Sequence, residues 1–434
     1  MKKTILITCL LFFATFIATG QTGSWSGKLD VQGTKLTLVF HLDGDEPSMD
    51  SPDQAAFGIP IQVERSELGK VSIQIPALGA SFEGQWLIKQ IVGTFKQMSL
   101  SLPLTLTPEK PLNRPQTPKE PFPYTQEEVT FSNGDAATLT GTLVLPEGYS
   151  RKTPVLVFVT GSGQEDRDET IFDHKPFAVI ADALGRAGIA TLRYDDRGMG
   201  GSTGDVAEAT TVDFKDDALA GIRMLRDRFD KVGVIGHSEG GLIALMLAAE
   251  KQVDFIVSLA GVAVSGIELL VAQSRTALEA AGYPEDQIET VCKAVGEAAY
   301  VRVHGGRMPF PDELDVPDGL KQVYQSILIQ IQSPWMRKLL SLDMRPQLGG
   351  ITCPVLAMNG TKDIQVDYES NLEALRNGLP ANPKNRIEAL EGLNHLFQHC
   401  TTGALTEYRQ IEETFAPEAL ELMAQWLAQV TALN

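Results

Sequence analysis

From Val129 onward, the sequence alternates short apolar runs, typical of buried strands, with longer amphipathic stretches, typical of helices. PVLVFVTG is followed by KPFAVIADALGRAG, and KVGVIG is followed by GGLIALMLAAE. Strands that alternate with helices in this way build a mainly parallel sheet with helices on both faces. The alternation therefore predicts an α/β fold for residues 125–434.

A long segment interrupts this alternation. About 80 residues from Val262 to Met344 are helical in character and are longer than an ordinary connection between a strand and a helix. The alternation then resumes with CPVLAMNG, RIEAL and a last helix, EALELMAQWLAQV. Because functional insertions gather at the active-site end of such a sheet, we expect a helical cap there, at about residues 262–345.

The residues before the α/β part follow a different pattern. LDVQGTKLTLVFHL and VSIQIPAL alternate apolar and polar positions, which predicts a small all-β domain over residues 21–105. Its opening, GSWSGKLDVQGTKLTLVFHL, is similar to the first strand pair of a lipocalin. Residues 106–124 carry a proline every few positions, so we expect an extended linker there.

The first residues have the pattern of a secretory signal. Lys2 and Lys3 precede an apolar run that begins at Ile5 and ends at Ala18, as in exported proteins. That run has about 14 residues, fewer than the roughly 20 that a membrane-spanning helix needs. We therefore expect residues 1–20 to be removed, which gives a periplasmic or extracellular protein without a membrane span.

Composition disfavours several classes of partner. The formal charge of −18 becomes about −20 without the two leader lysines, and the acidic residues are scattered, so the protein should repel nucleic acid. Beyond the leader there are three cysteines, Cys292, Cys353 and Cys400. Three cysteines are too few for a disulfide scaffold, and an odd number cannot pair completely. The sequence has neither CxxC nor HExxH spacing and calls for no metal or cofactor. It leaves the oligomeric state open.

Two segments match Gly-x-Ser-x-Gly, namely residues 236–240 and 200–204. A nucleophilic serine needs a strained turn between a buried strand and a helix, which exposes its hydroxyl and directs the helix N-terminus at the developing oxyanion. Ser238 follows VGVI and precedes GGLIALMLAAE, whereas Ser202 follows the loop DDRGMG, with no helical pattern until near Asp213. We therefore interpret Ser238 as the nucleophile and Ser202 as a structural turn residue.

The motif GHSEGG, with GSGQEDRDE upstream and RYDDRGMGGS between them, resembles bacterial α/β-hydrolase esterases and serine aminopeptidase-like proteins. The resemblance covers residues from about 129 to 430. It implies an α/β-hydrolase fold and a serine hydrolase that works through an acyl-enzyme. It leaves the β domain unexplained and does not specify a substrate.

Chain order points to the rest of a catalytic triad, because in this fold the acid follows a strand beyond the cap and the histidine follows the acid. Asp363 comes directly after the strand PVLAMNG, while its rival Asp367 is placed to begin the next helix. Two of the six histidines come later in the chain, His395 and His399. We expect His395, just beyond RIEAL, to be the base, with His399 as the alternative. His237 is assigned no catalytic role.

The oxyanion of the reaction needs backbone donors. We expect one from the N–H of Glu239 and another from the N–H of Ser162 or Gly163, in a loop of small residues that lets the backbone approach a substrate. Which of these two residues donates is left open by the sequence.

A charged segment follows the neighbouring strand. Asp195, Asp196 and Arg197 are expected to form an ion-paired scaffold below the oxyanion loop, with Asp166 and Arg167 as candidate partners. This assignment makes the segment structural.

Three functions fit these features. A carboxylesterase that takes a small acyl substrate is favoured, because apolar residues at 269–271 and 327–331 of the cap could line an acyl pocket. An aminopeptidase or amidase would use the same triad, and Glu165 with Asp166 is a candidate site for a substrate amino group. The third function is a binding protein, in which the β domain binds glycan or lipid and the α/β part is a non-catalytic scaffold. A complete triad argues against this function. Acyl chain length and leaving group are not encoded.

Overall fold

The computed structural model of the 434-residue chain describes residues 23–31, 33–42, 47–54, 56–66, 69–87, 89–98, 100–109 and 112–431. The expected leader, residues 1–20, lies outside the described residues. The chain divides into two compact units, Met1–Pro111 and Leu112–Asn434. In the described ranges, no helix combines the length and apolar character needed to cross a membrane.

The first unit is all-β, as predicted. Its described strands are β1 (Ser24–Val31), β2 (Thr34–His41), β3 (Ser48–Ser51), β4 (Ala56–Pro60), β5 (Gln62–Arg65), β6 (Lys70–Ile75), β7 (Ala80–Leu87), β8 (Gln90–Gln97) and β9 (Leu100–Pro108). They form an antiparallel sheet in the order β4-β3-β2-β1-β9-β8-β7-β6-β5. Alternate positions face a core that contains Trp25, Phe40, Phe82 and Ile91, because successive side chains of a strand point to opposite faces.

The second unit is built on a mainly parallel sheet, which confirms the predicted fold class. Its strands are β10 (Tyr124–Asn133), β11 (Ala137–Pro146), β12 (Val155–Val159), β13 (Ala190–Tyr194), β14 (Thr203–Gly204), β15 (Val232–His237), β16 (Ile256–Leu259), β17 (Val355–Gly360) and β18 (Arg386–Leu390). The order is β10-β11-β13-β12-β15-β16-β17-β18, with β14 against β11. Within this sheet, the consecutive strands β13, β12, β15, β16, β17 and β18 run parallel, so their carboxyl ends share one edge of the sheet.

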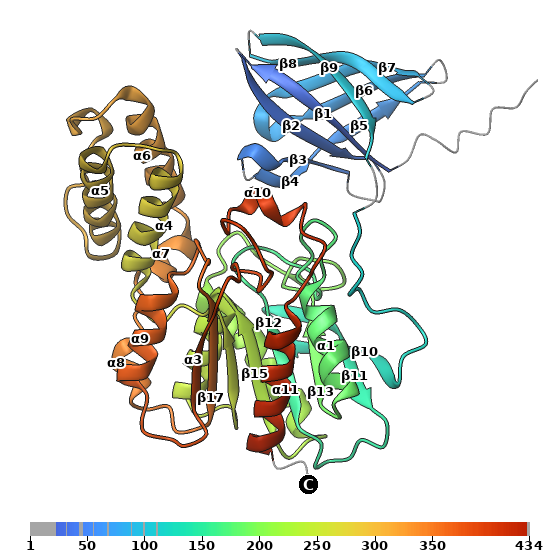
Figure 1. The fold of residues 1–434 in the computed structure, drawn as a ribbon, viewed down its shortest axis with the longest axis vertical. Coiled ribbons are helices and arrows are strands. Elements are labelled where there is room, and N and C mark those ends of the chain that lie inside the picture. The colour runs from blue at the N-terminus through green and yellow to red at the C-terminus, as the bar shows by residue number, and fades with distance from the viewer. Residues whose placement is uncertain are drawn as a thin grey trace, which may run out of the picture. The chain divides into compact units, whose positions relative to one another are not determined.

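Helices cover both faces of this sheet (Figure 1). The helices around it are α1 (Pro176–Arg186), α2 (Thr211–Arg226), α3 (Glu239–Ala249), α8 (Arg345–Leu348), α9 (Tyr368–Gly378), α10 (Leu405–Tyr408) and α11 (Pro417–Thr431). Strand β12 is buried on both sides: Val157 packs into the core with α2 and α3, and Phe158 into the core with α1 and α11. An all-apolar strand such as VLVFV is typical of this two-sided burial.

Between β16 and β17, four α-helices lie wholly within the segment expected to form a cap, and α8 follows them. They are α4 (Gly266–Ala280), α5 (Glu285–His304), α6 (Asp318–Gln330) and α7 (Pro334–Leu340). Figure 1 shows α4, α5 and α6 as a group of their own beside the sheet, away from α1 and α11. Helix α4 begins at a capping box, in which the Ser265 hydroxyl accepts the N–H of Glu268 and the Glu268 carboxylate accepts the N–H of Ser265.

The proline-rich segment from Leu112 onward belongs to the second unit. The buried Arg114 guanidinium donates to four backbone carbonyls, those of Asn113, Phe172, Arg409 and Ile411. Gln116 accepts the N–H groups of Thr414 and Phe415 and donates to the Phe415 carbonyl. This part of the segment is therefore anchored within the second unit.

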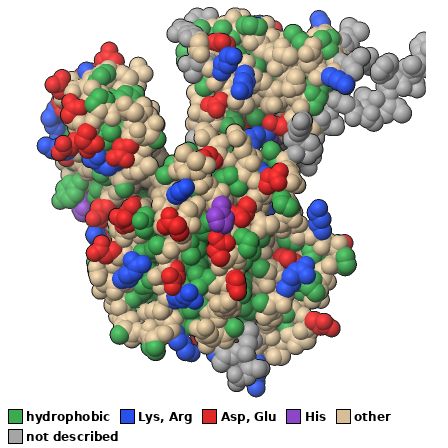
Figure 2. Space-filling model, in the orientation of Figure 1, with side chains coloured by type: hydrophobic (Ala, Val, Ile, Leu, Met, Phe, Trp, Pro, Cys, Tyr) green, Lys and Arg blue, Asp and Glu red, His purple; other side chains and the backbone are tan. Residues whose placement is uncertain are grey.

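Charged side chains are mixed over the surface. Figure 2 shows acidic side chains spread over the visible face of the second unit, with basic and apolar ones among them. The excess negative charge of the chain, −18, is thus distributed on this face, as the scattered acidic residues predict.

Candidate active site

Ser238 lies at the sharp turn where β15 ends and α3 begins, with φ 54° and ψ −115°. A non-glycine residue with positive φ is strained and is held so by its surroundings. The turn is tightly packed: a Cβ on Gly236 would lie 1.9 Å from the Gly240 carbonyl oxygen, and one on Gly240 would lie 2.1 Å from that of Val159. Only glycine fits at either position, which explains the spacing of the motif.

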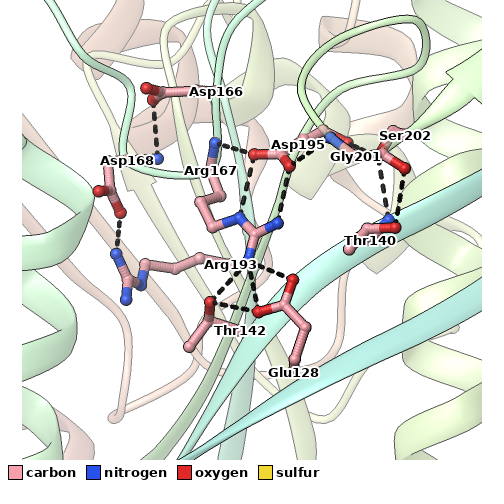
Figure 3. Close-up of polar contacts among 10 residues, drawn as sticks. All are labelled: Glu128, Thr140, Thr142, Asp166, Arg167, Asp168, Arg193, Asp195, Gly201 and Ser202. Carbon is pink, nitrogen blue, oxygen red and sulfur yellow. Dashed lines mark hydrogen bonds and ion pairs between the residues drawn. The ribbon is translucent and has the colours of Figure 1, made fainter.

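Ser202, in the other matching motif, has a structural environment. It is 6% exposed, its hydroxyl donates to the Asp195 carbonyl at 2.7 Å, and its oxygen accepts the N–H of Thr140 at 2.9 Å (Figure 3). The first bond closes the loop after β13 on itself, and the second ties this loop to β11. The serine closes a turn, and no helix begins there.

Changing Ser202 to alanine should therefore affect stability and not chemistry. The N–H of Thr140 would lose its acceptor, which should cost about 1–3 kcal/mol of unfolding free energy. Ester turnover per folded molecule should stay within about twofold of the wild-type value. Thermal melting together with steady-state kinetics measures both, and a loss of turnover without a drop in melting temperature would contradict the structural role.

Asp363 and His395 form a buried pair on the loops after β17 and β18. The Nδ1–H of His395 donates to Oδ2 of Asp363 at 2.7 Å, and the two side chains are 5% and 0% exposed. The other oxygen, Oδ1, accepts the N–H groups of Gln365 and Val366. This arrangement places the ring proton on Nδ1 and leaves Nε2 as a base. The rival acid Asp367 instead caps α9 by accepting a backbone N–H.

His399, the alternative base, lies on the surface. Its side chain is 55% exposed, and its ring nitrogens contact Glu413 at 2.9 Å and Glu418 at 3.0 Å. The hydrogen bond to Glu413 is the main cause that raises the pKa of His399. Burial opposes it, and the charges of Glu413 and Glu418 raise the pKa further. Of the two histidines, His395 is the one that contacts Asp363.

Ser238 is linked to this pair through its neighbour in the chain. The His237 ring centroid lies 4.5 Å from that of His395, and its Nε2–H donates to the His395 carbonyl at 2.9 Å. Within the described part of the chain, the Ser238 hydroxyl has no hydrogen-bond partner. The structure thus joins Asp363 and His395 directly and places Ser238 beside them.

The loop after β12 passes Ser238. A Cβ built on Gly161 would lie 3.5 Å from the Cβ of Ser238. The N–H of Gly161 donates to Glu169 at 3.0 Å, so it is already engaged. Among the described residues, the N–H groups of Ser162 and Gly163 have no acceptor, and both residues are exposed.

Glu239 adds a third N–H beside Ser238. As the first residue of α3, it has no helical carbonyl one turn earlier to accept its N–H. The N–H groups of Glu239, Ser162 and Gly163 are therefore free to bind an oxyanion.

The Glu239 side chain also has a function that the sequence did not reveal. It is 2% exposed and accepts from the hydroxyls of Ser162 and Thr211 and from the indole Nε1–H of Trp335. Burial raises its pKa, and these three donors offset that effect in part. Because Trp335 belongs to α7, this carboxylate joins the inserted helices to both the turn at Ser238 and the loop after β12.

The expected ion-paired scaffold is present in part (Figure 3): Arg167 pairs with Asp195 as expected, whereas Asp166 has another role. Arg167 binds both oxygens of Asp195 and also Glu128. Asp166 accepts the N–H groups of Asp168 and Thr170 instead of pairing with an arginine. The network therefore joins the loop after β12 to the strands beside it.

The remaining expected scaffold residues, Asp196 and Arg197, do not contact Asp166 or Arg167. Arg197 forms a buried pair with Asp217 at 2.7 Å. Asp196 accepts from the Thr160 hydroxyl at 2.9 Å and from the N–H of Glu165 at 3.0 Å. Burial raises the pKa of Asp196 to about 7, although these two donors lower it. With this pKa, Asp196 changes charge near neutral pH, in contact with the loop after β12.

This raised pKa predicts a pH-dependent stability. An aspartate whose pKa rises on folding stabilises the protein fully below its ordinary value of 3.8, and this contribution is lost as pH rises through about 7. The melting temperature of the wild type should therefore fall relative to that of Asp196→Asn as pH increases from about 5 to about 8. A difference between the two proteins that does not change with pH would contradict the assignment.

Other reactive groups are sparse in the described residues. No cluster of three or more His, Cys, Asp or Glu side chains there could hold a metal ion. Cys292, Cys353 and Cys400 are free thiols, and burial is the main cause that raises the pKa of each.

A serine after a central strand, followed in the chain by an acid and a histidine after later strands, is the arrangement that defines α/β hydrolases. The profile of the family described as "Alpha/beta hydrolase family" matches residues 156–401. The chain belongs to this family, and the predicted α/β-hydrolase fold is confirmed.

Individual relatives have low sequence identity to this chain. Esterase EstD of Thermotoga maritima is 27% identical over 282 residues, which is 64% of this chain and 61% of that protein. The chain thus spans less than two thirds of the length of this relative. An esterase of Pyrococcus furiosus, Pf2001, covers 74% of the chain and 99% of its own, at 17% identity and a TM-score of 0.45. The proline iminopeptidase of Mycobacterium smegmatis covers 70% and 99%, at 17% identity and a TM-score of 0.44.

Proposed function

We propose that this protein is a serine carboxylesterase that acts through an acyl-enzyme. The observation that carries the proposal is the buried 2.7 Å hydrogen bond between His395 and Asp363, beside Ser238 on its strained turn. Such a pair converts a weakly nucleophilic hydroxyl into an effective one. The similarity to esterase EstD supports an ester as the substrate.

In the first step, the Ser238 hydroxyl oxygen attacks the acyl carbonyl carbon while Nε2 of His395 takes the hydroxyl proton. Asp363 holds the ring by its Nδ1–H and stabilises the imidazolium that forms. The tetrahedral oxyanion is held by the N–H of Glu239 and by that of Ser162 or Gly163. The imidazolium then protonates the leaving alkoxide, which departs as an alcohol.

In the second step, water hydrolyses the acyl-enzyme. His395 takes a proton from the water as it attacks the ester carbonyl, and a second oxyanion forms at the same donors. Collapse of this intermediate returns the proton to the Ser238 oxygen and releases a carboxylic acid. The fixed N–H donors contribute most because they need no reorganisation as charge develops.

The cap residues expected to line an acyl pocket lie mainly in the core. Leu269, Leu270 and Ile331 are buried in the core that the inserted helices share with the sheet, while Ile329 is 68% exposed. These positions therefore contribute to folding, and we assign them no part in acyl recognition.

Two measurements on the purified protein test the proposal. A fluorophosphonate should label Ser238, as located by tryptic mapping, because only an activated serine reacts. A panel of p-nitrophenyl acyl esters should show turnover and rank the chain lengths. Label on another serine, or no label on an active preparation, would refute the mechanism.

An aminopeptidase is the second candidate, and Glu165 is the observation that favours it. A Cβ built on Gly161, next to Ser238, would lie 3.7 Å from Oε1 of Glu165. Among the described residues, this carboxylate has no hydrogen-bond or ion-pair partner. Burial raises its pKa well above the ordinary value, and neighbouring carboxylates, with Glu169 first, add to the effect. A substrate ammonium group there would relieve this repulsion.

Changing Glu165 to glutamine distinguishes the two functions. If an amino group binds there, turnover of aminoacyl p-nitroanilides should fall by about 10-fold or more, because one charged contact is lost. Turnover of simple p-nitrophenyl esters should be retained. Anilides with a blocked amino group provide the matched control substrate. Equal effects on all three substrates would argue against amine recognition by Glu165.

A further inference from the structure

His237 and Glu169 form a second buried histidine–carboxylate pair beside the proposed triad. Nδ1 of His237 lies 2.8 Å from Oε1 of Glu169, and the two side chains are 7% and 6% exposed. The other ring nitrogen, Nε2, lies 2.9 Å from the carbonyl oxygen of His395. Both nitrogens of the His237 ring are therefore engaged.

Counting protons fixes the state of this pair. The His395 carbonyl can only accept, so Nε2 of His237 carries a hydrogen. Oε1 of Glu169 also accepts the N–H of Gly161 at 3.0 Å. A neutral ring with its proton on Nε2 and an ionised carboxylate would place two acceptors at 2.8 Å, so the pair holds one more proton between them.

Electrostatics assigns that proton to the ring. Burial alone lowers the pKa of His237, but the charge and the hydrogen bond of Glu169, with the hydrogen bond to the His395 carbonyl, raise it overall. The pair is then an imidazolium and a carboxylate, whose opposite charges compensate each other inside the protein.

The contacts of the pair reach three separate segments of the site. Glu169 holds the backbone at Gly161 and so closes the loop that carries Ser162 and Gly163. His237 belongs to the turn that carries Ser238, and it holds the backbone of His395. The contact between His237 and Glu169 joins residues 68 positions apart in the chain, and the contact between His237 and His395 joins residues 158 positions apart.

We propose that His237 and Glu169 are positioning residues that act together as a buried ion pair and set the oxyanion loop and the base against Ser238. The inference rests on the proposed function, because it assigns roles to the segments that the ion pair joins. Their hydrogen bonds go to each other, to the N–H of Gly161 and to the carbonyl of His395. Both side chains therefore act through the backbone of segments that carry the proposed reacting groups.

The charge of His237 can be measured in the unmodified full-length chain. With ¹⁵N-labelled histidine, the His237 ring should show two protonated nitrogens at a pH of about 8, where an isolated histidine is neutral. The resonances are assigned by their absence in His237→Gln. A ring with one unprotonated nitrogen would overturn the ion pair.

Kinetics tests the positioning role. Glu169→Gln keeps an acceptor for Gly161 but removes the charge, and His237→Gln removes the bridge to Glu169. Each change should lower kcat for an ester by about 10- to 100-fold, because displacement of catalytic groups by an ångström costs this much. KM should change by less than about threefold, since no substrate contact is lost. The double variant should cost little more than either single change.

The surface pair of His399 and Glu413 provides the matched control. It joins a histidine to a carboxylate at 2.9 Å, but outside the site. His399→Gln and Glu413→Gln should leave kcat unchanged. Rates are expressed per active site titrated with fluorophosphonate, so that partial unfolding does not count as lost catalysis.

The outcomes separate this inference from the proposed function. Wild-type protein that turns over esters and is labelled at Ser238, with wild-type kcat in both glutamine variants, would overturn the positioning role alone. Failure of the wild type to be labelled at Ser238 would overturn the proposed function instead. If Glu169→Gln does not fold, the ring protonation measured in the wild type still decides whether the ion pair exists.

Discussion

Alanine at Ser238 or at His395 should lower kcat for an ester by about 10⁴- to 10⁶-fold, because each change removes a group that forms or breaks a bond. The double variant should be little worse than either single variant, since the two residues act as one unit. Asp363→Ala should be milder by about 10- to 100-fold, because the acid orients and stabilises the ring without reacting. Steady-state kinetics with active-site titration measures all four proteins.

Melting temperatures separate catalytic from structural loss in this series. Ser238→Ala and His395→Ala should melt near the wild-type temperature, whereas a purely structural role would make activity follow stability. His399→Ala is the control, because its exposed ring contacts Glu413 and Glu418 and not Asp363. Loss of turnover in that variant, with His395→Ala active, would transfer the base to position 399.

The proposed triad could be located from the sequence because its positions follow from chain order. Parallel strands end at one edge of the sheet, so residues directly after β15 and β17 must lie near each other. The motif at Ser238 was distinguished from that at Ser202 because a buried strand and a helix flank only the first. The periodicity of apolar residues shows where the strands and helices lie, and it can be recognised without knowing which residues are in contact.

The residues that support the site could not be located in this way. Glu169 and His237 are 68 positions apart, and Trp335 and Glu239 are 96 apart. These side chains meet because loops of irregular backbone fold over the sheet edge, and no periodicity encodes such loops. The buried carboxylates gave a weak signal, since GSGQEDRDE holds four acidic residues near the nucleophile, but their partners are fixed only by the fold.

The segment after the β domain shows the same division. Its prolines predict an extended chain, and from Leu112 to Pro123 the structure contains turns and coil without helix or strand. Nothing in the prolines predicts that Arg114 binds the carbonyls of Arg409 and Ile411, 295 and 297 positions later. An extended segment can therefore be part of a packed unit when one of its side chains satisfies buried backbone groups.

These contacts predict where the chain can be shortened. A protein that begins at Leu112 should fold and keep turnover of a small ester within about threefold of wild type, because its site lies in one compact unit. The yield of folded, active molecules should fall for a protein that begins at Tyr124. It lacks Arg114 and leaves the carbonyls of Phe172, Arg409 and Ile411 without their donors, at about 1–3 kcal/mol each. That sum approaches the whole stability of a domain, about 5–15 kcal/mol.

Point variants in the full-length chain separate the anchoring contacts from the effect of truncation. Arg114→Ala and Gln116→Ala together should lower the melting temperature and the yield of active sites titrated by fluorophosphonate. Lys119→Ala, an exposed position in the same segment, should change neither quantity. If the protein that begins at Tyr124 melts and turns over ester as well as the one that begins at Leu112, Arg114 does not anchor the unit. In that case water would have to take the place of Arg114 as the donor to these carbonyls. The burial of the guanidinium and its four backbone partners argue against this outcome.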